Sequence, residues 1–277
     1  MSFCGTVQFL ENNDLGNDHF LGVLDAATVG ELARPAQFVM LRAGSQHDPL
    51  LGRPFSIAQV ERGPRGTTVG ILYKVTGRGT AVMAELKPGA TVHMVGPLGR
   101  PFPDPADDEA AVFLVAGGIG VAPFPMLAAW LRGRGHTVQL LFGARTSADL
   151  VGRDLLAACD IDIEVATDDG SEGHRGFVTH LLEAQLSRLP ASSRRRACVY
   201  VCGPTPMMAA TDAVLARFGT PGHFSVESFM GCGFGVCLSC VVPVQGLGGE
   251  AEGYARVCVD GPTFPAGRIA WSRSVSL

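Results

Sequence analysis

The first hundred residues alternate short, β-branched apolar runs with glycine and proline, a pattern that predicts β-strands. We expect strands at residues 37–41, 55–58, 68–75 and 91–95, at the spacing of a barrel or sandwich. Two brief helices are expected to interrupt them, at residues 21–32 and 79–86. A proline-rich, acidic stretch at residues 101–109 ends this region and predicts a linker.

The middle of the chain changes to alternating strands and helices. We expect strands at residues 111–115, 138–142, 161–166 and 197–201, and helices at residues 124–131, 148–158, 178–186 and 207–218. This order favours a parallel sheet with helices on both faces. The sequence therefore predicts a multidomain β plus α/β protein: an N-terminal antiparallel β-barrel at residues 1–104, a parallel-sheet nucleotide-binding domain at 105–222 and a small C-terminal lobe at 223–277.

The composition gives no sign of a charged binding surface. The 277 residues carry 22 basic and 26 acidic side chains, a net charge of −4, which gives no basis for binding nucleic acid or anionic membranes. The basic run at residues 194–196 precedes an apolar strand and is interpreted as solvated. We find neither a membrane span nor the features of a signal peptide, so we expect a cytoplasmic protein.

Four of the eight cysteines are spaced as ligands of a metal cluster. Cys232, Cys237 and Cys240 follow the pattern C-x4-C-x2-C, and Cys258 follows at a distance, which is the plant-type spacing for a [2Fe–2S] cluster. Glycines in this loop allow the backbone to come close and to point N–H groups at the cluster. Structural zinc also binds four cysteines, usually as two close pairs, and stays open as the alternative. A disulfide framework is disfavoured in so long a chain.

Two turns between a strand and a helix are candidates for binding a nucleotide. In residues 116–123, the backbone at Gly117, Gly118 and Gly120 can approach a phosphate at a helix N-terminus. A turn of this kind can also be a simple tight corner, and it does not follow G-x-G-x-x-G. Cys202 lies at the carboxyl end of a later strand, where ligands bind in open parallel sheets, but it can equally be a buried cysteine.

Three further features fit a nucleotide cofactor only weakly. Residues 53–56, Arg-Pro-Phe-Ser, place a guanidinium and a hydroxyl group at a strand start, where they suit a pyrophosphate and a flavin edge. Residues 167–173 can contact a ribose or form an ordinary Asp-Gly turn. Arg145 follows another strand and can meet the 2′-phosphate of NADP or be a solvated turn residue, so NAD and NADP both stay open.

Together these residues resemble the ferredoxin-reductase superfamily and, more narrowly, the electron-transfer subunits of NAD-dependent (class 1B) dihydroorotate dehydrogenases. The motifs occur in the family's order over nearly the whole chain, at residues 53–58, 77–80, 96–99, 117–121, 169–171, 202–204, 231–240 and 258–262. The resemblance implies a β-barrel that binds FAD, an α/β domain that binds NAD, and a C-terminal [2Fe–2S] lobe. This chain departs from the family at Phe229, where the family usually has Arg, and at Ala36, where the family tends to have Gly.

By position, the resemblance implies which residues hold each cofactor. The residues assigned to FAD are Arg53, Pro54, Phe55, Ser56, Leu72, Tyr73, Lys74, Gly79 and Thr80. The residues assigned to NAD are Gly117, Gly118 and Gly120, which receive its phosphates, and Cys202, which faces the nicotinamide. The residues assigned to the cluster are Cys232, Cys237, Cys240 and Cys258. No side chain is expected to act as a catalytic acid, base or nucleophile.

The three cofactors imply an order of electron transfer. A nicotinamide exchanges hydride, an iron–sulfur cluster exchanges single electrons, and a flavin does both, so the flavin must lie between them. The resemblance implies the electron-transfer subunit of a heterotetramer in pyrimidine biosynthesis, with an FMN-bearing catalytic subunit that oxidises dihydroorotate. A reductase subunit of a ferredoxin-linked or electron-bifurcating complex is one alternative. A zinc-stabilised binding module without enzymatic activity is the other.

Overall fold

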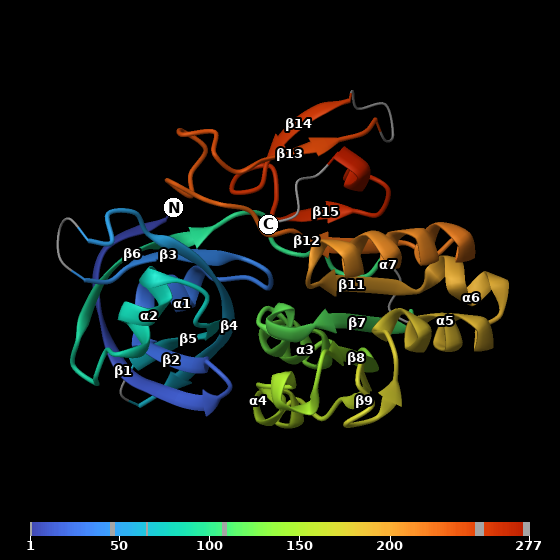
Figure 1. Ribbon diagram of the computed structural model, residues 1–277, viewed down its shortest axis with the longest axis horizontal. Coiled ribbons are helices and arrows are strands. Elements are labelled where there is room, and N and C mark those ends of the chain that lie inside the picture. Colours follow the sequence, from blue (N-terminus) through green and yellow to red (C-terminus); the bar gives the residue numbers. More distant parts are fainter. Residues whose placement is uncertain (1, 45–47, 65, 107–109, 247–251, 274–277) are drawn as a thin grey trace.

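The protein consists of a β-barrel, a layered α/β sheet and a C-terminal segment that lies across both (Figure 1). This computed structural model describes residues 2–44, 48–64, 66–106, 110–246 and 252–273. The architecture confirms the predicted fold class. The predicted linker at 101–109 is described up to residue 106, where it has neither helix nor strand.

Six antiparallel strands close the barrel in the order β1-β2-β5-β4-β3-β6. The strands are β1 (Phe3–Gly16), β2 (His19–Asp25), β3 (Phe38–Arg42), β4 (Arg53–Gly63), β5 (Gly66–Lys74) and β6 (Thr91–Leu98). Two short helices belong to the same part of the chain, α1 (Ala27–Leu32) and α2 (Arg78–Ala84). The four strands and the second helix that the sequence predicts here are confirmed.

The sequence pattern does not predict the secondary structure correctly at the beginning of the chain. Residues 19–25 form strand β2, so the helix predicted over residues 21–32 is wrong except for its last turns, which are α1. The pattern also does not predict β1, because that strand is polar and only two of its residues are buried. The signal for a hairpin lies in the turn, where Asn17 and Asp18 adopt φ values of 48° and 62°, the left-handed conformation of a two-residue hairpin turn.

The second sheet has the strand order β10-β9-β8-β7-β11-β12-β15. Neighbouring strands are parallel except at the β12–β15 pair, which is antiparallel. The strands are β7 (Val112–Gly117), β8 (Val138–Ala144), β9 (Asp162–Thr167), β10 (His174–Arg175), β11 (Cys198–Cys202), β12 (Gly222–Ser225) and β15 (Thr263–Pro265). Four of these strands, β7, β8, β9 and β11, lie where the sequence predicts them, whereas β10 and β12 are not predicted. The strands β7, β8 and β11 are mostly apolar and buried.

Helices cover both faces of this sheet, as predicted. They are α3 (Phe124–Arg132), α4 (Arg153–Ala157), α5 (Val178–Arg188), α6 (Ala191–Arg196) and α7 (Thr205–Phe218), with the 3₁₀ turns η1 (Gly118–Val121) and η2 (Ser147–Asp149). In β11, Val199 packs in the core with α5 and α7, whereas Tyr200 packs in the core with α3 and α4. The helix predicted at 148–158 is shorter, because Gly152 at φ 75° separates η2 from α4.

The C-terminal segment is attached to both other parts. It contains the hairpin β13 (Val241–Val244) and β14 (Gly253–Arg256), strand β15 at the edge of the larger sheet, and the 3₁₀ turn η3 (Trp271–Arg273). Its buried residues join the same core as residues of β3, β6 and β11. The predicted boundary after residue 222 falls inside β12, and the division at 104 and 222 stays a prediction.

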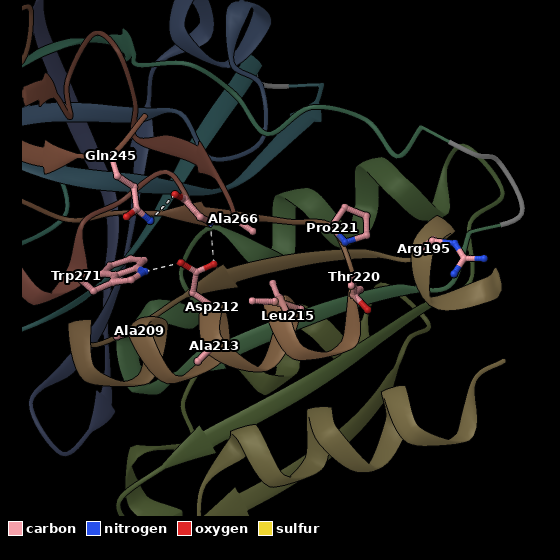
Figure 2. A pocket seen from close by; sticks show the side chains of 13 residues that line it. Arg195, Ala209, Asp212, Ala213, Leu215, Thr220, Pro221, Gln245, Ala266 and Trp271 are labelled. Carbon is pink, nitrogen blue, oxygen red and sulfur yellow. Dashed lines mark hydrogen bonds between the residues drawn. The ribbon is translucent and has the colours of Figure 1, made fainter. Parts of the chain in front are cut away.

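A cavity of about 730 Å³ lies between α7 and the C-terminal segment (Figure 2). Asp212 of α7 accepts hydrogen bonds from the Gly267 N–H at 2.9 Å and from Trp271 Nε1 at 2.7 Å, and so fastens the C-terminal segment to the helix. None of the predicted cofactor residues lines this cavity. In the described ranges, no helix is long and apolar enough to cross a membrane.

Candidate functional site: a cysteine loop and two nucleotide sites

The structure brings the four predicted cluster cysteines together as two pairs. Cys240 and Cys258 are both buried, and their sulfur atoms lie 3.2 Å apart. Cys232 and Cys237 form the second pair through a side-chain hydrogen bond, and Cys237 is exposed. The charge of Cys232 also acts on Cys258, so the two pairs are neighbours.

This arrangement fits a two-iron cluster better than a single structural ion. Structural zinc requires four donors around one point. Two pairs of thiols suit two iron atoms, and the glycine-rich loop suits the close approach of backbone N–H groups.

The electrostatic surroundings differ between the two cysteine pairs. Burial and the neighbouring Cys240 raise the pKa of Cys258 to about 12, so this thiol resists ionisation until a metal stabilises its thiolate. At the surface, hydrogen bonds from Ser239 lower the pKa of Cys237 to about 6. The positive charge of Arg256 acts on Cys258 and Cys240, and Asp260 holds this guanidinium at 3.2 Å.

The cysteine loop is closed on itself and packed on the barrel. The Gly231 N–H donates to Ser239 Oγ at 2.9 Å, which joins the two ends of the loop. Gly233 adopts φ 84°, and a Cβ atom there would lie 2.4 Å from Met40 Cγ and 3.1 Å from a methyl group of Leu98. Glycine at residue 233 therefore lets the loop pack directly on β3 and β6.

Arg53 and Gly79, both predicted to bind FAD, lie against each other. A Cβ atom on Gly79 would lie 2.3 Å from Arg53 Nε, so the arginine side chain runs across the space left by the missing side chain. The Thr80 hydroxyl accepts from the N–H groups of Thr76 and Gly77 at 3.0 and 3.2 Å and caps the start of α2. A guanidinium beside a helix start can hold a pyrophosphate.

The neighbouring residues of β4 alternate between the interior and the surface of the barrel. Phe55 is buried and makes an edge contact with Tyr73, whereas Pro54 and Ser56 are half-buried. The register pairs Pro54 with Met40 and Ser56 with Phe38 on β3. Because β3 also carries the contact to the cysteine loop, the start of β4 lies between Gly79 and that loop.

The side chains of the FAD candidates Leu72, Tyr73 and Lys74 are engaged elsewhere. Leu72 packs in the core of the second sheet, and Tyr73 lies in the barrel interior, where its hydroxyl donates to Asn12 Oδ1 at 2.9 Å. Burial raises the pKa of Tyr73 to about 12. Lys74 Nζ lies 3.0 Å from Asp149 Oδ1. A flavin contact from this strand would therefore come from its backbone.

The three glycines predicted to receive phosphates differ in their surroundings. A Cβ atom at Gly120 would lie 2.4 Å from the Cys202 carbonyl oxygen, and one at Gly117 would lie 2.5 Å from Met207 Sδ. These two glycines allow the turn after β7 to pack on the turn after β11. Gly118 has φ 52° and no neighbour within 4 Å of an added Cβ, so it faces open space.

Cys202 lies at the carboxyl end of β11 as predicted, but its side chain is 1% exposed and packs in the core. Burial, and then the negative charge of Glu227, raise the pKa of its thiol, so Cys202 is a neutral group at this edge. Glu227, Ser239 and Asp149 take part in these sites although the sequence does not single them out. For Ser239 the signal is available, because a hydroxyl directly before the third cysteine can reach the loop.

The comparisons with known proteins identify the class and then the family. An NADH-dependent reduced ferredoxin–NADP oxidoreductase, solved to study flavin-based electron bifurcation, superposes with a TM-score of 0.81 at 29% identity, over 96% of this chain and 90% of that chain. The ferredoxin reductase of carbazole 1,9a-dioxygenase follows with a TM-score of 0.65 at 26% identity, over 80% and 68%. Fold and site thus define an oxidoreductase of the ferredoxin-reductase type.

The sequence comparisons narrow this class. Residues 227–270 match the iron–sulfur cluster binding domain of dihydroorotate dehydrogenase B, and residues 114–213 match the oxidoreductase NAD-binding domain. The dihydroorotate dehydrogenase B (NAD(+)) electron transfer subunits of Desulforamulus reducens and Geobacillus kaustophilus are 39% and 40% identical, each over 89% of this chain and 90% of the relative. The chain belongs to this family of electron transfer subunits.

The cysteine geometry leads to a first prediction. Protein prepared without oxygen should contain about two irons and two sulfides per chain, and Cys258→Ser should lose the visible absorption of the cluster while the flavin absorption remains, because one buried thiolate is missing. Cys159, a half-buried thiol away from the loop, serves as the control, and Cys159→Ser should keep the spectrum. Equimolar zinc without iron would contradict the assignment.

A second prediction concerns Arg53 and Gly79. Arg53→Ala should weaken FAD binding by about 2–3 kcal/mol, because a charged hydrogen bond to the pyrophosphate is lost. Gly79→Ala should weaken binding in the same direction, since the added methyl group displaces Arg53. The retained flavin is measured after gel filtration, with Gly63→Ala, in open space in the same barrel, as the control. Unchanged FAD retention in Arg53→Ala would show that the arginine does not hold the cofactor.

Proposed function

We propose that this chain is the electron-transfer subunit of a dihydroorotate dehydrogenase in pyrimidine biosynthesis. It receives electrons from an FMN-bearing catalytic subunit that oxidises dihydroorotate, and it delivers them to NAD+. When bound, FAD would exchange single electrons with the cluster and hydride with the nicotinamide. The observation that carries the proposal is the packing of Gly233 on Met40 and Leu98, which keeps the cysteine loop against the barrel strands next to Arg53.

In this proposal the cysteine loop holds the [2Fe–2S] cluster. Cys232 and Cys237 serve one iron, and Cys240 and Cys258 serve the other, in keeping with their pairing. Ser239 Oγ lies 3.1 Å from the Cys237 sulfur and can donate a hydrogen bond to its thiolate. A hydrogen bond to a ligand sulfur and a nearby positive charge both stabilise the added electron of a reduced cluster.

The barrel holds FAD in this proposal. The Arg53 guanidinium and the start of α2, at Gly79 and Thr80, bind its pyrophosphate. The start of β4 and the end of β5 would hold the flavin. The residues beside it are Pro54, Phe55 and Ser56, with the backbone of Leu72, Tyr73 and Lys74.

The sheet domain holds NAD in this proposal. The backbone at Gly118 approaches the phosphates, while Gly117 and Gly120 keep the turn packed. Cys202 supplies an uncharged surface at the carboxyl edge of β11, next to the position of the nicotinamide. The barrel, the sheet domain and the C-terminal lobe thus correspond to the proposed FAD, NAD and cluster domains at 1–104, 105–222 and 223–277.

A surface for the catalytic subunit is available around the cysteines. Four apolar side chains of this region are exposed, at fractions from 54% to 75%: Phe229, Phe234, Val236 and Leu238. These four side chains do not pack inward onto the two larger domains, although Met230, directly before the loop, packs against the core. Exposed apolar side chains clustered on one loop favour coverage by another protein.

A reductase subunit of an electron-bifurcating complex is the second candidate, because the superposed NADH-dependent ferredoxin–NADP oxidoreductase covers 96% of this chain. The two candidates differ in their partner, so co-purification of a dihydroorotate-oxidising subunit separates them. The zinc-stabilised module differs in colour, since a flavin with an iron–sulfur cluster is brown-yellow and a zinc protein is colourless.

The partner surface leads to a third prediction. The isolated chain should reduce artificial acceptors with NADH but should not oxidise dihydroorotate, and addition of the catalytic subunit should give dihydroorotate-dependent NAD+ reduction. Phe234→Asp should abolish only this coupled reaction, because a charge on the apolar surface opposes docking. Phe177→Asp, at an equally exposed site before α5, is the control. Dihydroorotate oxidation by the isolated chain, or an unchanged coupled rate in folded Phe234→Asp, would refute the proposed interface.

A further inference from the structure

The barrel and the sheet domain are joined by a polar contact made by Asn17, Lys74 and Asp149. Asp149 Oδ1, in η2, accepts from Lys74 Nζ at 3.0 Å and from Asn17 Nδ2 at 2.8 Å. Lys74 ends β5 and Asn17 lies in the β1–β2 turn, so both donors belong to the barrel. One carboxylate of the sheet domain therefore binds two separate segments of the barrel.

This contact is sheltered enough to hold its geometry. The side chains of Lys74 and Asp149 are 26% and 16% exposed, so water screens the pair less than an ordinary surface ion pair. Burial raises the pKa of Asp149, but the hydrogen bond and the charge of Lys74 outweigh this effect, and the pKa lies below its usual value. Thr146 Oγ1 approaches the second carboxylate oxygen at 3.4 Å, and the Arg145 charge also favours the ionised form.

Behind the contact, His19 is fully buried next to Lys74 on the paired strand. Burial and the charge of Lys74 lower the pKa of His19, so its ring is neutral and does not compete for the carboxylate. Its Nδ1 atom has no hydrogen-bond partner among the described residues. Lys74 is the cation that contacts Asp149.

An apolar contact runs parallel to the polar one. Leu72 lies two residues before Lys74, and alternate residues of a strand share a face, so both side chains point toward the sheet domain. Leu72 packs in its core, and a Cβ atom at Gly152 would lie 2.9 Å from Leu72 Cδ2. The end of β5 therefore meets residues 149–152 with an apolar and a charged side chain in succession.

We propose that Asn17, Lys74 and Asp149 form a latch that fixes the angle between the barrel and the sheet domain, and that they are positioning residues for electron exchange between the two nucleotide sites. Lys74 is one residue beyond Tyr73 on the proposed flavin strand, and Asp149 follows β8, at the carboxyl edge of the sheet that carries Gly118. The catalytic part of this inference rests on the proposed function, whereas the latch itself rests on the contacts alone.

The latch is tested with Lys74→Met, Asp149→Ala and the double variant of the full chain. In each single variant, amide hydrogen exchange at residues 146–150 and 16–19 should accelerate, because the two segments lose their tie. Anaerobic stopped-flow reduction of bound FAD by NADH should slow at least about tenfold, since misplacement of the reacting groups lowers the rate steeply. The double variant should be no slower than the slower single variant, and Lys74→Arg should recover most of the rate.

Matched controls separate the latch from general charge effects. Lys87→Met removes the other lysine, which is exposed, and Asp160→Asn disrupts a 2.8 Å ion pair to Arg132 within the sheet domain. Both controls should leave hydrogen exchange at the latch and the reduction rate unchanged. Asn17→Asp keeps the Lys74–Asp149 ion pair but replaces the third contact with a repulsive one. Aspartate tolerates the left-handed turn yet repels Asp149, so amide hydrogen exchange at the latch should accelerate in this variant as well.

Two results would overturn the inference. Unchanged hydrogen exchange in Lys74→Met, Asp149→Ala and Asn17→Asp would show that the contact does not hold the domains. Slower reduction in Lys74→Met with normal reduction in Asp149→Ala would place Lys74 on a cofactor instead of in a latch. If parent protein carries no flavin that NADH reduces, the proposed function fails, and the exchange experiment still decides whether the latch exists.

Discussion

The C-terminal segment cannot bury its own cysteines, and its structure depends on a core shared with the barrel and the sheet domain. Cys240 and Cys258 belong to one apolar cluster with Met40 and Leu98 of the barrel, and with strands and helices of the sheet domain. A lobe of this size has too little core of its own and usually relies on a metal or on a larger partner for stability. Here the shared core also fixes the cysteine loop relative to both nucleotide sites, so folding and the order of the redox centres follow from the same packing.

The sequence predicts those parts of the fold that are encoded locally. The strands β7, β8 and β11 are mostly apolar runs, and the cysteine spacing is a local property of one loop. The sequence does not predict the hairpin β1–β2, because these two strands form through pairing with β5 and β6. Apolar periodicity does not detect pairing of that kind. The prediction of one helix over residues 148–158 is wrong for a different reason. Gly152 adopts a left-handed conformation that ends the helical path, and residues 149–152 meet the barrel instead.

The candidate site shows the same limit at the level of side chains. A motif can place Leu72, Tyr73 and Lys74 beside a flavin, but it cannot say which face of the strand each side chain occupies. The closure of the barrel decides this, and it sends Tyr73 inward while Leu72 and Lys74 reach the second domain. For Arg53 the motif places the side chain correctly but does not reveal its neighbour. Gly79 belongs to a second motif, and the two motifs lie together only because α2 packs on β4.

The glycine-rich turn after β7 shows why a fingerprint alone cannot separate binding from packing. Gly120 is required because the carbonyl of Cys202 lies where its side chain would be, and a Cβ atom at Gly117 would lie 2.9 Å from the Pro204 ring. These constraints come from two turns that share the carboxyl edge of the sheet, and they exist whether or not a nucleotide binds. Gly118 is the residue that packing does not explain, since it faces open space in a backbone conformation that favours glycine. The same pattern of three glycines thus has two physical causes, and the structure is needed to assign each residue to its cause.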